Sequence, residues 1–205
     1  MTADGLDAVT LDAYGTLIEL DDHLGRLRAA LGEAGIERTA AEVAAAFDAE
    51  LAHYRAHQCE ARDAETLAAL RRECAAVFVG ALGEEIDFAQ AFMGALVFRP
   101  LPGVLDALAA LRGRGLVLAA VSNWDCALPE RLAETGIELD VVVTCAEAGA
   151  AKPATAIFEL ALERLGVPAQ RALHVGDSPE DEQGARAAGL HFAPAPLADV
   201  VAGWR

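Results

Sequence analysis

Short, almost wholly apolar runs that end in small or polar residues constrain the fold of this chain more than any other feature. Three of them are AVTLDAYGT at 8–16, LVLAAVSN at 116–123 and ALHVGDS at 172–178. Runs without a polar alternation are typical of parallel strands that are covered by helices on both faces. DVVVT at 140–144 and LHFA at 190–193 are two further strand candidates.

Helical patterns with clear start signals lie between these runs. Pro102 precedes a stripe of leucines that ends at Leu111, and Pro153 opens a second helical pattern that continues to Leu165. Ser178 and Pro179 resemble an N-cap followed by the first helical residue. The alternation of strand and helix predicts an α/β fold with a doubly wound, Rossmann-like parallel sheet and right-handed crossovers.

The segment 20–97 breaks this alternation and contains helical patterns only. Thr39 and Glu42 have the spacing of a capping box, and Asp63 is a candidate N-cap for the next helix. The sequence therefore predicts a core formed by residues 1–19 and 98–205, with an all-helical cap inserted at 20–97.

The charge balance excludes several classes of partner. Sixteen Lys and Arg residues stand against 32 Asp and Glu, which gives a formal net charge of −16 and disfavours nucleic acid and anionic membrane surfaces. The Met1 to Leu11 segment has no basic start, and its apolar run is too short for a signal peptide or a membrane span. We expect a cytoplasmic protein, a monomer or a homodimer, that acts on a small anionic molecule at a local positive site.

Polar residues that suggest chemistry follow the predicted strands directly. In an open parallel sheet, ligands bind beyond the carboxyl ends of the strands, so these side chains are expected to meet at one edge. The candidates that share this position, or that begin a nearby helix, are Asp12, Thr16, Ser122, Asn123, Lys152, Asp177 and Asp181.

Four stretches in this order, DAYGTL, SN, AGAAKPATAIFELAL and HVGDSPEDEQGARAAG, resemble the four motifs of the haloacid dehalogenase superfamily of hydrolases. The superfamily places a cap after the first motif. The resemblance implies that Asp12 is the nucleophile and forms a covalent aspartyl intermediate. It implies that Thr16 and Ser122 hydrogen-bond the transferring group, that Asn123 lies beside them, and that Lys152 offsets negative charge.

The resemblance also implies a magnesium site. Its protein ligands would be Asp12, Asp177, Asp181 and the backbone carbonyl of Tyr14, and Mg²⁺ prefers such hard oxygen ligands. The implied function is a magnesium-dependent, phosphatase-like hydrolase that acts on a small phosphorylated metabolite, with Tyr14 among the substrate-binding residues.

Tyr14 supports an alternative hypothesis about the function. Most phosphatases of the superfamily have an aspartate here, which protonates the leaving oxygen, and a phenol with an ordinary pKa of about 10 is a poor base at neutral pH. The haloacid dehalogenases proper share the DxYGT pattern, and a halide leaves without protonation. They use no metal, however, and typically lack Asp177. The alternatives are a metal-independent 2-haloacid dehalogenase, with Arg26 or Arg28 as halide ligand, and a catalytically weak binding or regulatory module.

Three other polar residues receive less specific predictions. His174 is expected to be a packed core histidine rather than a ligand. Asp125 is a candidate for shaping the mouth of the pocket or, equally, for an ordinary carboxylate at a helix start. Glu147 precedes Lys152 in the same loop and is a candidate for orienting that lysine.

Overall fold

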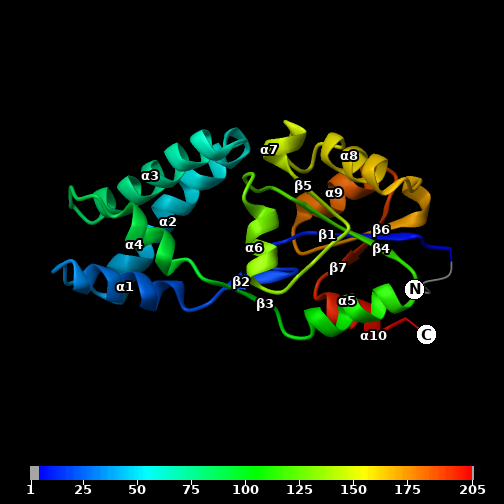
Figure 1. Ribbon diagram of the computed structural model, residues 1–205, viewed down its shortest axis with the longest axis horizontal. Coiled ribbons are helices and arrows are strands. Elements are labelled where there is room, and N and C mark those ends of the chain that lie inside the picture. The colour runs from blue at the N-terminus through cyan, green and yellow to red at the C-terminus, as the bar shows by residue number, and fades with distance from the viewer. Residues whose placement is uncertain (1–4, 205) are drawn as a thin grey trace. The chain divides into compact units, whose positions relative to one another are not determined.

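The chain divides into two compact units in a computed structural model, which describes residues 5–204 (Figure 1). One unit consists of the chain up to Glu19 together with the chain from Arg99 onward, and the other is Leu20–Phe98. We call them the core unit and the helical unit. Residues 1–4 and 205, which belong to the predicted core segments, lie outside the described residues.

The core unit is built on a parallel sheet of five strands within the described residues, in the order β5-β4-β1-β6-β7. The α/β fold class is confirmed, and every predicted strand is present. The strands are β1 (Ala8–Leu11), β4 (Val117–Ser122), β5 (Val141–Thr144), β6 (Ala172–Gly176) and β7 (His191–Pro194). All four residues of β1, the central strand, are fully buried, which explains why its sequence does not alternate.

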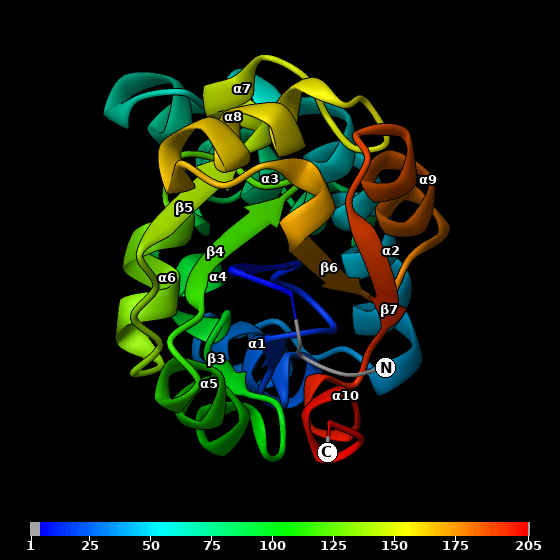
Figure 2. The same cartoon turned by 90° about the vertical axis from the view of Figure 1, so that its right-hand side faces the viewer.

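Helices cover both faces of the sheet. Figures 1 and 2 show α8 and α9 on one side of the strands and α5 and α10 on the other. The helices of this unit are α5 (Val104–Gly113), α6 (Leu128–Glu134), α7 (Cys145–Ala148), α8 (Ala156–Leu165), α9 (Pro179–Ala187) and α10 (Leu197–Ala202). A 3₁₀ turn, η2 (Ala169–Arg171), precedes β6.

The register of the strands aligns the residues that follow them. Leu11 of β1 lies opposite Ala120 of β4 and Val175 of β6. The backbone N–H of Asp12 then donates to the carbonyl of Val175 at 2.9 Å, which extends the β1–β6 ladder by one residue. The ends of β1, β4 and β6 therefore lie side by side, as expected for a parallel sheet.

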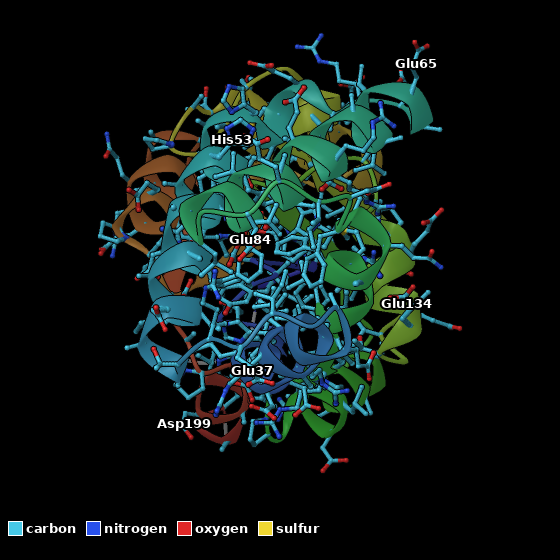
Figure 3. All side chains as sticks on the ribbon, turned by 90° about the vertical axis from the view of Figure 1, so that its left-hand side faces the viewer. Glu37, His53, Glu65, Glu84, Glu134 and Asp199 are labelled. Atoms are coloured by element: carbon cyan, nitrogen blue, oxygen red, sulfur yellow. The ribbon has the colours of Figure 1, made fainter. Side chains whose placement is uncertain are left out.

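The helical unit contains α1 (His23–Glu33), α2 (Ala40–His57), α3 (Ala64–Ala81) and α4 (Ala89–Ala95), with a 3₁₀ turn η1 (Gln58–Glu60). Both predicted N-caps are present. Thr39 forms a reciprocal capping box with Glu42, and the Asp63 carboxylate accepts from two backbone N–H groups at the start of α3. Glu65, in the first turn of α3, projects from the edge of the unit (Figure 3).

Aromatic packing holds the helical unit together. The ring of Phe78, which is fully buried, lies 5.2 Å from the ring of Phe92 and 6.1 Å from that of Phe88. Fully burying a phenylalanine stabilises a fold by about 1.5–3 kcal/mol. These contacts join α3 to α4 and the residue before it.

A short two-stranded sheet was not predicted. It pairs β2 (Ile18–Leu20) with β3 (Phe98–Pro100), where the chain passes between the two units. Three residues are too few for a period-2 pattern to stand out in the sequence. Among the described residues, no helix combines the length and apolar character that a membrane crossing requires.

Candidate active site

A tight turn after β1 places Asp12 and Thr16 in the same small region. The carbonyl of Ala13 accepts from the backbone N–H groups of Thr16, Leu17 and Ile18, at 3.4, 2.8 and 2.9 Å. Gly15 has a φ of +84°, which favours glycine, and its N–H donates back to Ile18. The chain therefore folds back at once after the nucleophile candidate.

Lys152 joins two carboxylates at the edge of the sheet. Its Nζ lies 2.5 Å from Oδ1 of Asp12 and 2.5 Å from Oδ1 of Asp181. The side chains are 4%, 9% and 0% exposed for Lys152, Asp12 and Asp181, so these charges are held almost without water. Lys152 is also the only lysine in the sequence.

The ionised forms are favoured within this cluster. Burial by itself lowers the pKa of Lys152, but the charges of Asp12 and Asp181 outweigh it and leave the pKa above its ordinary value. Burial likewise raises the pKa of Asp181, whereas hydrogen bonds from His174 and Lys152 bring it well below its ordinary range. Opposite charge and hydrogen bonding thus overcome desolvation.

Ser122, the last residue of β4, and Asn123, which follows it, hold the nucleophile candidate and the lysine. Ser122 donates its hydroxyl to Oδ1 of Asp12 at 3.0 Å. The side-chain amide of Asn123 accepts from the backbone N–H of Lys152 at 2.7 Å and donates to the carbonyl of Lys152 at 3.2 Å. Asn123 therefore fastens the loop that carries Lys152 to the end of β4.

Asp181 has hydrogen-bond donors on both of its carboxylate oxygens. Oδ1 accepts from Lys152 and from Nε2 of His174, and Oδ2 accepts from the backbone N–H and the hydroxyl of Ser178. Gly176 makes room for this side chain, because a Cβ there would lie 2.4 Å from Cγ of Asp181. Of the predicted metal ligands, Asp181 is thus the one most completely bonded to the protein.

Asp177 completes a cluster of three carboxylates. Single oxygen atoms of Asp12, Asp177 and Asp181 lie within 4.8 Å of one another, and Asp177 is the exposed member. Burial, followed by the charges of Asp12 and Asp181, raises the pKa of Asp177. Its carboxylate also lies close to Gly15, because a Cβ on Gly15 would be 2.1 Å from Oδ2 of Asp177.

Thr16 and Tyr14 differ in their surroundings. The Thr16 side chain is buried, and its Oγ1 has no hydrogen-bond partner within the described part of the chain. A buried hydroxyl without a partner is rare and is a sign of a ligand group. Tyr14, in contrast, is 44% exposed.

The structure also tests the three less specific predictions. Asp125 does not cap α6, whose N-cap is Ala127; its Oδ1 instead accepts from the N–H of Ala127 at 2.8 Å, in the turn before that helix. Glu147 does not contact Lys152 and pairs instead with Arg164 at 2.6 and 3.0 Å, so the prediction that it orients the lysine is wrong. Arg164 lies in α8 and forms the ion pair with this carboxylate.

His174 is fully buried in the core, as predicted, but it has a specific partner that sequence reasoning missed. Its Nε2 lies 3.1 Å from Oδ1 of Asp181, and its Nδ1 lies 2.9 Å from the hydroxyl of Thr10. The pairing of β1 with β6, with Thr10 opposite His174, is the signal that would have revealed the second contact.

Comparisons with known proteins place this chain in a family. A model of the haloacid dehalogenase-like hydrolases matches residues 6–189. Haloacid dehalogenase-like hydrolase domain-containing protein 3 from Xenopus laevis is 42% identical over 108 residues, which are 51% of this chain and 43% of that protein. Pyrimidine 5'-nucleotidase YjjG from Escherichia coli (strain K12) is 37% identical over 98 residues, which are 45% of this chain and 44% of that protein.

A solved structure extends the similarity to a second kind of enzyme. L-2-haloacid dehalogenase from Xanthobacter autotrophicus, with chloropropionic acid covalently bound, is 26% identical with a TM-score of 0.68, covering 97% of this chain and 83% of that one. The matches to the first three curated relatives span 43%, 41% and 55% of those proteins, about half of their length. Because the family model covers most of the sequence, the chain belongs to the haloacid dehalogenase-like hydrolases.

Proposed function

We propose that the protein is a magnesium-dependent phosphohydrolase that acts through an aspartyl-phosphate on a small phosphorylated metabolite. One observation carries the proposal. Asp12, Asp177 and Asp181 lie together, and the ammonium group of Lys152 pairs with two of them, Asp12 and Asp181. The cluster therefore has an excess of negative charge, and its exposed member has a raised pKa. A divalent cation would neutralise that excess.

The donor set fits Mg²⁺, which binds through carboxylate and carbonyl oxygens. Asp12 and Asp177 would hold the ion together with the carbonyl of Tyr14, the residue before Gly15, which lies close to Asp177. Asp181 would contribute its charge to the cluster while it holds Lys152. A bound magnesium ion would stabilise negative charge on the transferring phosphoryl group.

The other residues of the site have separate roles in the proposed reaction. Lys152 and Ser122 both bond Oδ1 of Asp12, so we assign Oδ2 as the attacking atom. Its bond to phosphorus forms as the bond to the leaving oxygen breaks, and water later attacks the phosphorus and releases phosphate with Asp12 restored. The unpartnered hydroxyl of Thr16 would donate to a phosphoryl oxygen. Asn123 holds Lys152 in place throughout.

A metal-independent 2-haloacid dehalogenase is the second candidate. Two observations favour it: Tyr14 stands two residues after Asp12, and the chain resembles a dehalogenase structure that carries a covalently bound chloropropionic acid. In that reaction Asp12 would attack carbon, chloride would leave, and water would hydrolyse the resulting ester. The two arginines considered as halide ligands have other partners: Arg26 pairs with Asp21, and Arg28 donates to a backbone carbonyl.

The test is a substrate panel with and without metal. Purified protein is incubated with phosphorylated metabolites and with 2-chloropropionate, in Mg²⁺ or in excess chelator, and phosphate and chloride are measured. We expect phosphate release that requires Mg²⁺ and that disappears in Asp12→Asn. Phosphate release that persists in chelator would refute the proposed mechanism, and chloride release in chelator would establish the alternative.

A third possibility, a binding or regulatory module, is tested at the same residue. We expect beryllofluoride with Mg²⁺ to form an adduct at Asp12, which ¹⁹F NMR detects, and Asp12→Asn to abolish it. The absence of both an adduct and turnover would favour the module. We further propose that residues 20–97 form the cap and that the protein acts in the cytoplasm as a monomer or homodimer.

A further inference from the structure

A pair of buried side chains, Thr10 of β1 and His174 of β6, lies behind the proposed site and has no assigned role. Both residues are 0% exposed. The hydroxyl of Thr10 lies 2.9 Å from Nδ1 of His174, and Nε2 of His174 lies 3.1 Å from Oδ1 of Asp181. The pair therefore reaches the proposed site through Asp181.

The carboxylate of Asp181 fixes the direction of one hydrogen bond, and a neutral ring fixes the direction of the other. An ionised carboxylate only accepts, so Nε2 of His174 must carry a proton and donate to Asp181. In a neutral ring Nδ1 is then an acceptor, and the Thr10 hydroxyl is the donor. Thr10 thus selects the tautomer that His174 needs.

The ring is also held in orientation by packing. Phe158 of α8 meets it edge to face at 5.0 Å, and Phe192 of β7 lies 6.4 Å away. A rotated ring would lose both the Asp181 and the Thr10 hydrogen bonds. The position of Nε2–H is therefore set by neighbours on three sides, from β1, α8 and β7.

His174 and Lys152 bond the same oxygen atom, Oδ1 of Asp181. If His174 did not donate to this oxygen, Lys152 would be its only donor among the residues that the structure describes. A fully buried carboxylate oxygen would then attract the ammonium group more strongly, at the expense of Asp12. The donation from His174 thus affects how Lys152 is shared between Asp181 and Asp12.

We propose that His174, oriented by Thr10, is a positioning residue that holds Asp181 so that Lys152 stays bonded to Asp12. This inference rests on the proposed function, in which Asp12 is the nucleophile. It gives Asp181 a role in positioning, and it extends the catalytic machinery by two residues that do not touch the substrate.

The first test compares two substitutions of the same residue. His174→Gln can place an amide N–H near the position of Nε2, whereas His174→Leu fills similar space without a donor. We expect kcat to fall about 10- to 100-fold in His174→Leu with KM changed less than about 3-fold, and to recover largely in His174→Gln. Equal losses in two folded variants, or no loss in His174→Leu, would overturn the proposal.

A second test does not depend on turnover. Because Lys152 is the only lysine, ¹⁵N-lysine labelling gives one side-chain Nζ resonance. We expect this resonance to move in His174→Leu and to stay near its wild-type position in His174→Gln. An unchanged resonance in His174→Leu would refute the inference, even if the wild-type protein releases no phosphate and the proposed function fails.

Two substitutions of Thr10 give a milder test in case His174→Leu does not fold. Thr10→Val removes the hydroxyl at nearly constant shape, and Thr10→Ser keeps it. We expect the ring nitrogens of His174 to show the Nε2–H tautomer in wild type and Thr10→Ser, with a mixture and a several-fold lower kcat in Thr10→Val. A wild-type ring protonated at Nδ1 alone would contradict the proposed chain of donors.

Discussion

The two units bury charged side chains in opposite ways. In the core unit, Lys152 is paired with Asp12 and Asp181, and the ionised state is favoured although water is excluded. In the helical unit, Glu50 of α2 is 4% exposed and forms no ion pair with any described residue. Its carboxyl group forms a side-chain hydrogen bond with Cys74. Burial raises the pKa of Glu50 to about 6. The comparison shows that burial alone drives a carboxylate toward neutrality, and that partners reverse this outcome.

Removal of the shared lysine should have the largest effect on stability. Lys152→Met leaves Asp12 and Asp181 buried without their cation, and breaking a buried pair in this way costs about 3–5 kcal/mol. We expect the free energy of unfolding to fall by this amount at pH 8, with activity lost. Urea denaturation measures the change.

The double variant Lys152→Met with Asp181→Asn is the matched control for this prediction. It removes one of the stranded charges, so stability should recover in part while activity does not. If Lys152→Met unfolds like the wild type, the buried charges of the core unit are not coupled, and the contrast with Glu50 disappears.

A carboxylate added at the exposed edge of the core cluster should change the reaction without a comparable cost in stability. Tyr14 is 44% exposed, so Tyr14→Asp is not forced into the low-dielectric interior. General acid catalysis is typically worth about 10²–10⁴ in rate, and we expect about 100-fold faster turnover of alkyl phosphates relative to aryl phosphates. Tyr14→Asn, which cannot donate a carboxylic proton, should show no such gain. Equal rates for Tyr14→Asp and Tyr14→Asn would refute the inference that the wild-type site lacks a general acid.

The pH dependence of stability tests the helical side of the comparison. The pKa of Glu50 is about 6 in the folded state and about 4.5 in the unfolded state. The ionised carboxylate therefore destabilises the folded state, and this loss of stability is absent below pH 4.5 and complete above pH 6. The shift of about 1.5 units corresponds to roughly 2 kcal/mol lost as the pH rises. Glu50→Gln should therefore be up to about 2 kcal/mol more stable than wild type at pH 8, and the advantage should vanish near pH 4.

Asp48→Asn, an exposed change on the same helix, is the control and should show little pH-dependent difference from wild type. Urea denaturation at both pH values measures the effect. If Glu50→Gln gives no advantage at high pH, Glu50 has a compensating partner and the two units do not differ as described.

The smallest predicted effect concerns the exposed capping box of Thr39 and Glu42 at the start of α2, in the helical unit. Thr39→Ala removes the side chain that accepts from the N–H of Glu42, and the loss of an N-cap costs about 1 kcal/mol. Thr39→Ser should retain most of this stability. A loss of stability as large as that of Lys152→Met would mean that burial does not determine how strongly a polar contact stabilises this protein.

Much of the fold of both units followed from the sequence because its signals are long or local. The strand β4 is a run of apolar residues with a polar end, and the N-caps Thr39 and Asp63 fit simple rules. The strands β2 and β3 were missed because each has three residues, and their pairing joins segments almost 80 residues apart.

The candidate site was predicted as a set of residues but not as a network. Motif order indicated Asp12, Lys152 and Asp181, whereas no local pattern shows that Asn123 bonds the backbone of Lys152. The contact between Thr10 and His174 also depends on the register of two strands that lie far apart in sequence. Such contacts arise only once the sheet is assembled.

The single lysine of this sequence gives the protein one side-chain amine, and that amine is 4% exposed between two carboxylates. Reagents that acylate amines react with the neutral, accessible form, so Lys152 should resist labelling for as long as the core unit stays closed. The rate at which that one side chain is acylated therefore reports how often the core unit opens. A binding partner that closes the site would slow this rate, and mass spectrometry of the intact chain would follow it without any assay of turnover.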